Sequence, residues 1–427
     1  MLCYNIIYIK NFNLIIVDHI ITGIDIGSNS IKLAVGQKGA DGYVNIIGGV
    51  EVSSDGINKG MVSSLEDAVS CVSRLIEQAE KMIGVQIESV YLGLAGPHII
   101  SQNSHGVVAV AKAEGEVRQD DVDRVLSSAQ AVASPHNYEI MHVLPQEFII
   151  DGQRGIKDAV GMTGVRLEVE AHIIQGLISQ NKNLTTAIYR TGVDINDYIF
   201  SVLGTAEAVL TKKQKDLGVC LVNIGQSITT LVVYEDNNIL TTSVLQIGSR
   251  HITSDLAIGL KTNIDIAEAI KIKYGIEDEK SLEKKDFLNL SDFDSNNQDK
   301  ISKKEIKNII EARVEEMFTM IDKELKKINR NAKLPAGIIL TGGGAKLSGI
   351  INVAKKICKL PAEIGAVQNV NSIIDKTSDP AFSTAIGLVL FGSKYEDEEF
   401  GNKGRGYKKG GNPFKFIKDM FGKFLPN

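Results

Sequence analysis

Two spacings of apolar residues alternate along most of the chain. Apolar positions in residues 24–36 and 43–52 predict paired strands around a polar turn at 39–42. Residues 65–83 have apolar positions at helical spacing, and residues 90–94 form a short apolar run typical of a buried strand. This succession predicts an α/β fold.

The pattern changes between residues 99 and 178. The sequence there predicts a strand at 106–111, a helix at 120–133 and a strand at 139–150, followed by glycine-rich stretches. We expect a small α+β domain inserted into the first half of the chain.

The second half repeats the opening pattern. The predicted elements are strands at 218–233 and 239–245, helical spacing at 252–274, a polar stretch at 277–304, a long helix at 306–328 and a strand entering a glycine turn at 337–347. The repetition predicts two related halves.

Composition narrows the class of protein. A chain of 427 residues with 43% hydrophobic residues suggests two to four domains. No apolar run reaches the ~18 residues of a spanning helix. A formal charge of −5 argues against a nucleic-acid binder. The four cysteines are far apart, which favours a reducing compartment. Residues 1–19 make a poor signal peptide, and we expect a short extension before the first strand.

A strand-turn-strand motif occurs twice, and it carries the strongest chemical signal. The first copy is IDIGSNSIK at 24–32, and the second is VNIGQSITT at 222–230. Glycine allows a tight turn whose N–H groups can surround phosphate oxygens. One copy alone is equally consistent with an ordinary hairpin turn, but two facing copies could hold a polyphosphate. The candidate residues are Asp25, Gly27, Ser28, Asn29, Lys32, Asn223, Gly225, Gln226 and Ser227.

Two further features complete this candidate site. Asp25 ends an apolar strand, where its carboxylate could hold Mg²⁺ directly or through water. Gly342, Gly343 and Gly344 follow the strand at 337–341, and no side chain there would block a flat ring or ribose. Alone they indicate only a tight loop; together with the two phosphate turns they predict a seat for adenosine.

The order of these motifs resembles the actin-like ATPase superfamily, and within it the FtsA family of bacterial cell-division proteins. The matching segments are LGLAGPH at 92–98, LPQEF at 144–148, DG at 151–152, GMTGVRLE at 161–168, AHII at 171–174, GSRHITSD at 248–255 and AEAIK at 267–271. The resemblance covers about residues 20–393 and the tail.

The resemblance implies a two-lobed actin-like ATPase fold of duplicated RNase H-like lobes, with an inserted SHS2-like α+β domain and a C-terminal amphipathic helix. The expected boundaries are 20–98, 179–216 (first lobe), 99–178 (insert), 217–255 and 336–393 (second lobe), 256–335 (second-lobe subdomain), 394–411 (flexible linker) and 412–427 (membrane-targeting helix).

The resemblance also implies roles for single residues. Phosphate contacts would come from both turns, adenosine would lie beside Gly342 to Gly344, and Glu268 with Lys271 would reach the ribose or base. Without the resemblance, Glu268 and Lys271 are simply a charge pair on one helix.

Two departures from the active ATPases predict slow or absent turnover. Asn223 stands where many members have Asp, which weakens a second Mg²⁺ contact. The helix at 203–208 has no catalytic carboxylate at the expected place, because Glu207 is offset. We expect ATP to bind with Mg²⁺ and to act as an assembly switch.

The last 27 residues combine a glycine-rich basic stretch with an amphipathic pattern. Residues 401–427 hold seven Lys or Arg and one Asp, so the rest of the chain is strongly acidic. On a helix starting at Asn412 and Pro413, the apolar half would carry Phe414, Phe416, Ile417, Met420, Phe421, Phe424 and Leu425, and the other half Lys415, Lys418 and Lys423. The helix could dock on its own body, but the pattern favours an anchor in an anionic membrane surface.

The resemblance implies three kinds of partner and a place in the cell. The C-terminal peptide of the tubulin-like protein FtsZ would bind residues 256–335, with Arg313 as one contact, although Arg313 could equally be a solvated helix charge. The insert would contact the next protomer of a filament or other division proteins. The protein would then polymerise on the cytoplasmic membrane face and tether the FtsZ ring at the septum. The alternatives are a pilus-assembly actin homologue, which needs no amphipathic tail, and a metabolite kinase, which needs a catalytic Asp that the sequence lacks.

Overall fold

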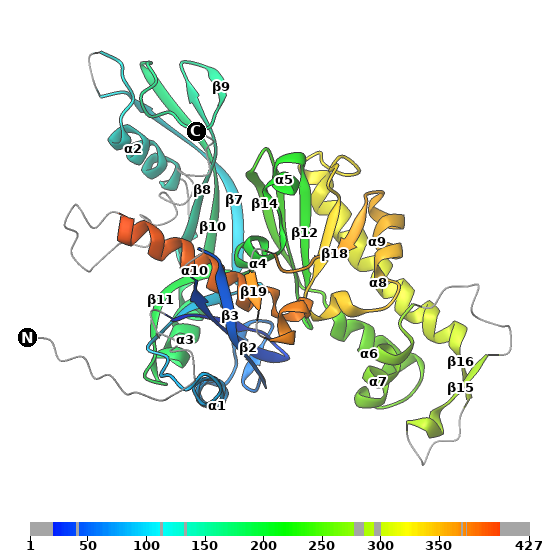
Figure 1. The fold of residues 1–427 in the computed structure, drawn as a ribbon. Coiled ribbons are helices and arrows are strands. Elements are labelled where there is room, and N and C mark those ends of the chain that lie inside the picture. Colours follow the sequence, from blue (N-terminus) through cyan, green and yellow to red (C-terminus); the bar gives the residue numbers. More distant parts are fainter. Residues whose placement is uncertain are drawn as a thin grey trace, which may run out of the picture.

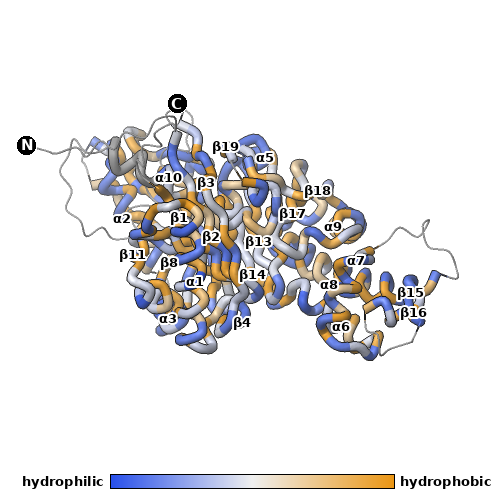
Figure 2. The backbone as a smooth tube through the Cα atoms, turned by 60° about the horizontal axis from the view of Figure 1, so that its bottom comes forward, coloured by the Kyte–Doolittle hydropathy of each residue, from blue (hydrophilic) through white to orange (hydrophobic). Residues whose placement is uncertain are grey.

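The computed structural model describes residues 20–39, 42–111, 114–131, 135–276, 286–293, 300–368, 370–372 and 374–401. It contains two lobes, each built on its own sheet, and a smaller domain that projects from the first lobe (Figure 1). Figure 2 shows hydrophobic residues along much of the central strands of both lobes, where the two large cores lie.

The first lobe has a six-stranded sheet. Its strands in spatial order are β11 (Asp194–Phe200), β6 (Ser89–Leu94), β1 (Ile20–Ile26), β2 (Ser30–Lys38), β3 (Val44–Ser53) and β19 (Val370–Ser372). β1, β2 and β3 form an antiparallel meander, and β6 runs parallel to both β1 and β11. Helix α1 (Leu65–Ile83) covers one face with α3 (Ile178–Tyr189) beside it, and α10 (Ser383–Gly401) lies on the other face, so the sheet is buried on both sides.

The second lobe has a five-stranded sheet. Its order is β14 (Asn238–Leu245), β13 (Thr229–Glu235), β12 (Val219–Ile224), β17 (Ile338–Thr341) and β18 (Ala362–Ile364). Its helices are α6 (Ser249–Gly259), α7 (Ile264–Tyr274), α8 (Lys303–Lys327) and α9 (Ile350–Cys358). The small pair β15 (Phe287–Asn289) and β16 (Lys300–Ser302) lies at the far end of this lobe (Figure 1).

The two sheets repeat one topology. In each, a three-stranded antiparallel meander is followed by two strands added in parallel, giving β3-β2-β1-β6-β11 in the first lobe and β14-β13-β12-β17-β18 in the second. Helices connect the parallel strands in both lobes. The repeat predicted from the two motifs is therefore a repeat of whole lobes.

The smaller domain leaves the first lobe after β6 and returns to it at α3. It has a four-stranded sheet in the order β7 (Ile99–Ala109), β10 (Arg166–Leu177), β8 (Tyr138–Ile150) and β9 (Gln153–Ile156), with α2 (Gln119–Gln130) on one face. A separate apolar core lies between this sheet and α2. We refer to residues 99–177 as the insert.

Two helices lie between the lobes and cross each other closely. These are α4 (Ser201–Val209), which α5 (Lys212–Leu217) follows, and α10. A Cβ on Gly387 would lie 1.9 Å from the carbonyl oxygen of Gly204, so only glycine permits this approach of the two backbones. The remaining short elements are β4 (Ile57–Asn58), β5 (Met61–Val62) and the 3₁₀ turns at Leu290–Asp292, Gly343–Lys346, Asp375–Ser378 and Pro380–Phe382.

The structure differs from the sequence-based prediction at several boundaries; the strand predicted at 106–111, for example, is β7, which begins at Ile99 and ends at Ala109. The helix predicted over 252–274 is two helices, because Asn263 accepts a hydrogen bond from the Ile266 N–H (2.9 Å) and starts α7 anew. The linker predicted from residue 394 begins inside α10, which continues to Gly401. The expected helix at 412–427, the rest of the linker and the extension at 1–19 lie outside the described residues. Within the part of the chain that is described, no helix is long and apolar enough to cross a membrane.

Candidate functional site between the lobes

The first glycine turn connects β1 to β2 and is fixed by its own backbone. A Cβ on Gly27 would lie 2.6 Å from the carbonyl oxygen of Ser30, so the turn is as tight as the sequence predicted. The Ser28 hydroxyl accepts a hydrogen bond from the Gly60 N–H (3.2 Å). Asn29 is exposed at the tip of the turn.

Asp25 stands just before this turn, beside Lys32 on the neighbouring strand. The two residues are register partners, and Lys32 also lies 3.1 Å from a carboxylate oxygen of Glu51. Burial raises the pKa of Asp25 to about 6, and the positive charge of Lys32 only partly opposes this shift. The Asp25 carboxylate is therefore short of compensating charge, a condition that a bound cation would relieve.

The second glycine turn connects β12 to β13 and is held by the start of α6. The Gly225 N–H donates to the Ile228 carbonyl (2.9 Å). The N–H groups of Ser249 and Arg250 donate to the carbonyls of Gly225 and Gln226 at 2.9 and 2.8 Å. The first turn of α6 therefore fixes this loop. Ser227, the remaining candidate here, is buried.

The two turns meet directly. The Gln226 side-chain amide donates to the Asn29 side-chain oxygen at 2.9 Å, although the residues are 197 positions apart in the chain. Turns on separate lobes thus face each other across the gap where the lobes meet. This contact confirms that the two motifs lie together in space.

The third glycine turn follows β17 and packs against the second. Gly342 has φ +85°, and a Cβ there would lie 2.3 Å from the Asn223 side-chain oxygen. A Cβ on Gly344 would lie 2.4 Å from the Ile224 side chain. Around Gly343 no described atom lies within 4 Å of the Cβ position, so this residue borders open space next to the second turn.

Asn223 makes a directional chain of hydrogen bonds behind the second turn. Its amide donates to the Thr384 hydroxyl (3.1 Å), and Thr384 and Thr205 are 2.9 Å apart. Thr205 donates its own proton to the Ser201 carbonyl (2.9 Å), so Thr384 must donate to Thr205. This chain connects β12 to α4 and α10, and it needs a donor at position 223.

Glu268 and Lys271 form a closed group with Thr253 of α6. The Lys271 ammonium donates to the Glu268 carboxylate (2.7 Å) and to the Thr253 hydroxyl (3.0 Å), and it is buried. The Glu268 side chain is 44% exposed. α7 ends beside the loop after the third turn, since the Ile276 N–H donates to the Ser348 carbonyl. A ligand would reach Glu268 more easily than Lys271.

Arg313, the predicted partner contact, and Glu207, which the sequence places away from the expected catalytic position, are both paired within the fold. Glu207 lies between Lys215 (2.6 Å) and Lys394, and these lysines lower its pKa to about 2 despite burial. Arg313 of α8 makes a two-pronged ion pair with Asp255 of α6 (2.5 and 2.9 Å) and a further pair with Glu316. In this structure Glu207 therefore connects α4 to α5 and α10, and Arg313 connects α8 to α6.

Thr205 and Thr384 could not be recognised as site residues from the sequence. They lie far apart in the chain, and nothing in their surroundings distinguishes them from other helix threonines. Gly204 and Gly387 carried a weak signal, because a glycine inside a helix often marks close packing.

The fold is that of the actin-like ATPases. One solved structure, of a PilM–PilN type IV pilus biogenesis complex, matches 87% of this chain and 98% of that chain with a TM-score of 0.65 and 16% identity. MreB5 of Spiroplasma citri, solved with ADP, matches 90% of this chain and 98% of that chain with a TM-score of 0.52 and 12% identity. These likenesses establish the class through the fold alone.

Sequence comparison gives the family within this class. Residues 96–175 match the model for the SHS2 domain inserted in FtsA, and residues 220–387 match the model for cell division protein FtsA. The FtsA proteins of Pseudomonas aeruginosa and Escherichia coli K12 are each 34% identical to this chain over 88% of its length and 90% of theirs. The chain belongs to the FtsA family of actin-like cell-division proteins.

Proposed function

We propose that this protein binds ATP between its lobes, polymerises on the cytoplasmic membrane face and tethers the FtsZ ring there through residues 412–427. The contact between Gln226 and Asn29 carries the nucleotide part, because it brings two phosphate-type turns within one hydrogen bond of each other. Gly343 supports it, since its open surroundings leave room for adenosine beside the second turn.

Magnesium would enter with the nucleotide and lie near Asp25. In the described ranges, no group of three or more His, Cys, Asp or Glu side chains is placed to hold a metal ion. Mg²⁺ commonly takes one or two carboxylates and completes its shell with phosphate oxygens and water. The half-buried Asp25, with its raised pKa, fits that role.

Two residues near the site support slow hydrolysis of ATP. Asn223 cannot supply a second carboxylate, and its amide already donates to Thr384. Glu207 is neutralised by two lysines, so it is a poor base for activating water. We therefore propose that ATP controls assembly, and that hydrolysis is slow or absent.

The membrane and partner roles rest on sequence and family. The Phe-rich, Lys-bearing pattern of residues 412–427 suits a helix lying in an anionic membrane surface. The proposed site for the FtsZ peptide is the region 256–335, where α6, α7 and α8 pack together. An acidic peptide reaching Arg313 would have to compete with Asp255 and Glu316 for its guanidinium.

Vesicle sedimentation with the full chain tests the proposal. The wild-type protein should pellet with anionic vesicles, and more of it should pellet with Mg·ATP than without nucleotide. Deleting 412–427 should leave it in solution, whereas Lys182→Ala, a charge change at an exposed position of α3, should pellet like wild type. Unchanged pelleting of the deletion would refute the anchor. Phosphate release at about one per second or faster, the range of ordinary kinases, would refute slow turnover.

A further inference from the structure

Two sequence motifs of the insert have no part in the nucleotide site. They are LPQEF at 144–148, on β8, and AHII at 171–174, on β10. Gln146, in the first motif, directs its side-chain amide to strand β14 of the second lobe. It donates to the carbonyl oxygens of Ile239 (2.7 Å) and Leu240 (3.0 Å).

The second motif contacts the same strand through His172. Burial lowers the pKa of His172 to about 4, so its ring is neutral and carries one proton. One ring nitrogen, Nδ1, lies 2.7 Å from the Asn103 side-chain oxygen, which can only accept, so the proton is on Nδ1. Nε2 therefore accepts from the Thr242 hydroxyl, 3.0 Å away.

Thr242 is held on a second side as well. The Ser101 hydroxyl of β7 donates to the Thr242 carbonyl at 2.8 Å. The contacts thus come from β7, β8 and β10 and converge on residues 239–242 of β14, which is the edge strand of the second-lobe sheet. Figure 1 shows these four strands next to one another. Side chains of the insert occupy carbonyls that an open edge would expose.

The insert belongs to the first lobe by its chain connections, yet it is hydrogen-bonded to the second. We propose that Gln146 and His172 form a latch that couples the insert to the second lobe, so that nucleotide-driven movement of the lobes repositions the insert. The nucleotide part of this inference rests on the proposed function. In the latch, both residues are positioning residues with no role in binding ATP.

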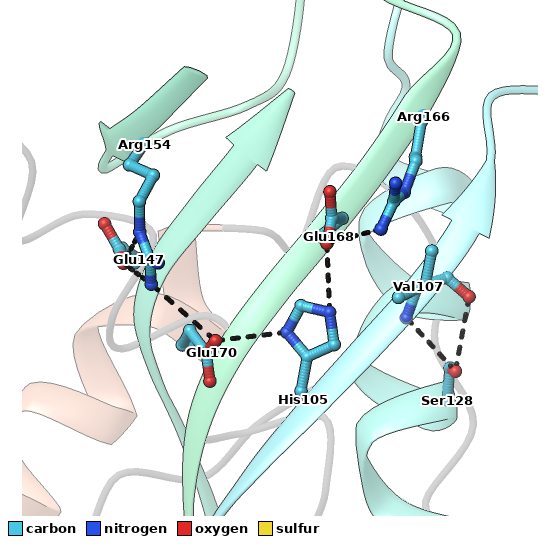
Figure 3. A network of polar contacts seen from close by, with 8 residues as sticks. All are labelled: His105, Val107, Ser128, Glu147, Arg154, Arg166, Glu168 and Glu170. Carbon is cyan, nitrogen blue, oxygen red and sulfur yellow. Dashed lines mark hydrogen bonds and ion pairs between the residues drawn. The ribbon is translucent and has the colours of Figure 1, made fainter. Parts of the chain in front are cut away.

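The latch continues directly into a network of charged side chains that is largely open to solvent, although Glu168 itself is buried. Glu168 and Glu170 alternate with His172 along β10 and so share its face of the sheet. Figure 3 shows His105 between these two glutamates, at 2.9 and 3.1 Å, with Arg166 on Glu168. Arg154 extends the network to Glu147, the residue after Gln146 (Figure 3). Movement at β14 would reach this network through a single rigid sheet.

Hydrogen–deuterium exchange on the full chain tests the latch in two arms. Without nucleotide, Gln146→Ala and Thr242→Val should each speed exchange in residues 238–245 and in β8 or β10, on the order of fivefold to tenfold, the size expected for one lost buried hydrogen bond. Thr242→Val keeps the side-chain shape and tests the His172 contact from the other lobe. Gln153→Ala, on the exposed edge strand of the same insert, is the matched control and should change neither.

The second arm adds Mg·ATP. In the wild type, nucleotide should slow exchange both in the turns at 24–30 and 223–228 and in β8 and β10. In the double variant of Gln146→Ala and Thr242→Val, protection should remain at the turns and weaken in β8 and β10, where only the contact from Ser101 to the Thr242 carbonyl is left.

Each outcome bears on a separate claim. Equal exchange of wild type and variants in the first arm overturns the latch. Protection of the turns without any change in the wild-type insert, or insert protection that is undiminished in the double variant, overturns the coupling alone. Absence of protection at the turns overturns the coupling together with the proposed nucleotide site, while the first arm still decides the latch.

Discussion

The two lobes share a topology but use the same strand end for different chemistry. In the first lobe β1 runs beside β2 and β6, and in the second β12 runs beside β13 and β17, so Asp25 and Asn223 occupy equivalent places. Asp25 is a carboxylate whose pKa is raised by burial. Asn223 is an amide that donates into a chain of hydroxyls. The two lobes thus share the path of the backbone at this point but differ in the side chain that it carries.

This difference suits the two residues to different roles in the candidate site between the lobes. The first lobe offers charge for a cation, whereas the second connects its phosphate turn to both helices that lie between the lobes. A turn tied to α4 and α10 would respond to any movement of the lobes, while one carboxylate is sufficient for Mg²⁺ when phosphates supply other ligands. The comparison thus favours an assembly switch over a fast ATPase.

The two lobes also differ in the strand that lies parallel to β1 or β12, which is β6 in the first lobe and β17 in the second. Gly93 of β6 pairs with Asp25, and Thr341 of β17 pairs with Asn223. The following residue is buried Leu94 in the first lobe but Gly342, with φ +85°, in the second. β17 therefore turns away one residue earlier than β6, which opens the space around Gly343.

Gly342→Ala should have the largest effect among the changes that test this comparison. The new methyl would meet Asn223 and the Ile224 carbonyl within 2.6 Å, in a backbone conformation that only glycine adopts readily. We expect a loss of about 3 kcal/mol or more in the free energy of unfolding, measured in urea. Leu94→Ala, at the equivalent place, is the comparison variant: it should lose about 2–5 kcal/mol, as core truncations do, but leave the turns intact. Near-normal stability of Gly342→Ala would contradict the early turn.

Asn223→Asp should come next in size. An ionised Asp cannot donate to Thr384, so the hydroxyl of Thr384 would turn to the carboxylate and leave Thr205 without its donor. We expect a loss of about 2 kcal/mol in urea unfolding without nucleotide. Asn29→Asp, an exposed change in the first turn, is the control and should cost much less. Unchanged stability of Asn223→Asp would show that the hydrogen bonds from position 223 to Thr384 and Thr205 do not require a donor at position 223.

Asp25→Asn should raise the free energy of unfolding, whereas the two changes above should lower it. The folded pKa of about 6 lies above the ordinary value of 3.8, so the folded protein prefers the protonated carboxyl. Stability from this preference is present at low pH and is lost as the pH rises through 6. Relative to wild type, the variant should gain about 1 kcal/mol above pH 6, after allowing for partial exposure, and little at pH 4.

The same variant tests the cation. Nucleotide binding by wild type should strengthen with Mg²⁺ and weaken below about pH 6, where Asp25 takes up a proton. In Asp25→Asn, titration calorimetry should show affinity that depends on neither Mg²⁺ nor this pH range. An unchanged Mg²⁺ dependence would place the cation elsewhere.

Much of this architecture could be predicted from the sequence, because periodicity and turn glycines are local properties. The helix at 65–83 and the strand ending at Leu94 match the structure closely, and the duplicated motif identified both turns. The contact partners could not be predicted. From the sequence, Arg313 was expected to contact a partner and Glu207 was only an offset carboxylate, but the fold brings Asp255 to one and Lys394 to the other across long stretches of chain. Thr205 and Thr384 come within hydrogen-bond distance only because α4 crosses α10 in the folded protein.

Gly343→Ala should have the smallest effect on stability and so isolates ligand binding. No described atom lies within 4 Å of the new methyl, and the backbone there does not require glycine. We expect a change in the free energy of unfolding within about 0.5 kcal/mol. If adenosine lies in this opening, the methyl intrudes on it and the dissociation constant for ATP should rise severalfold, whereas Gly192→Ala, at an equally open but distant turn with φ +84°, should leave affinity unchanged. Equal affinity of Gly343→Ala and wild type would place the base away from the third turn, and the early end of β17 would then need another explanation.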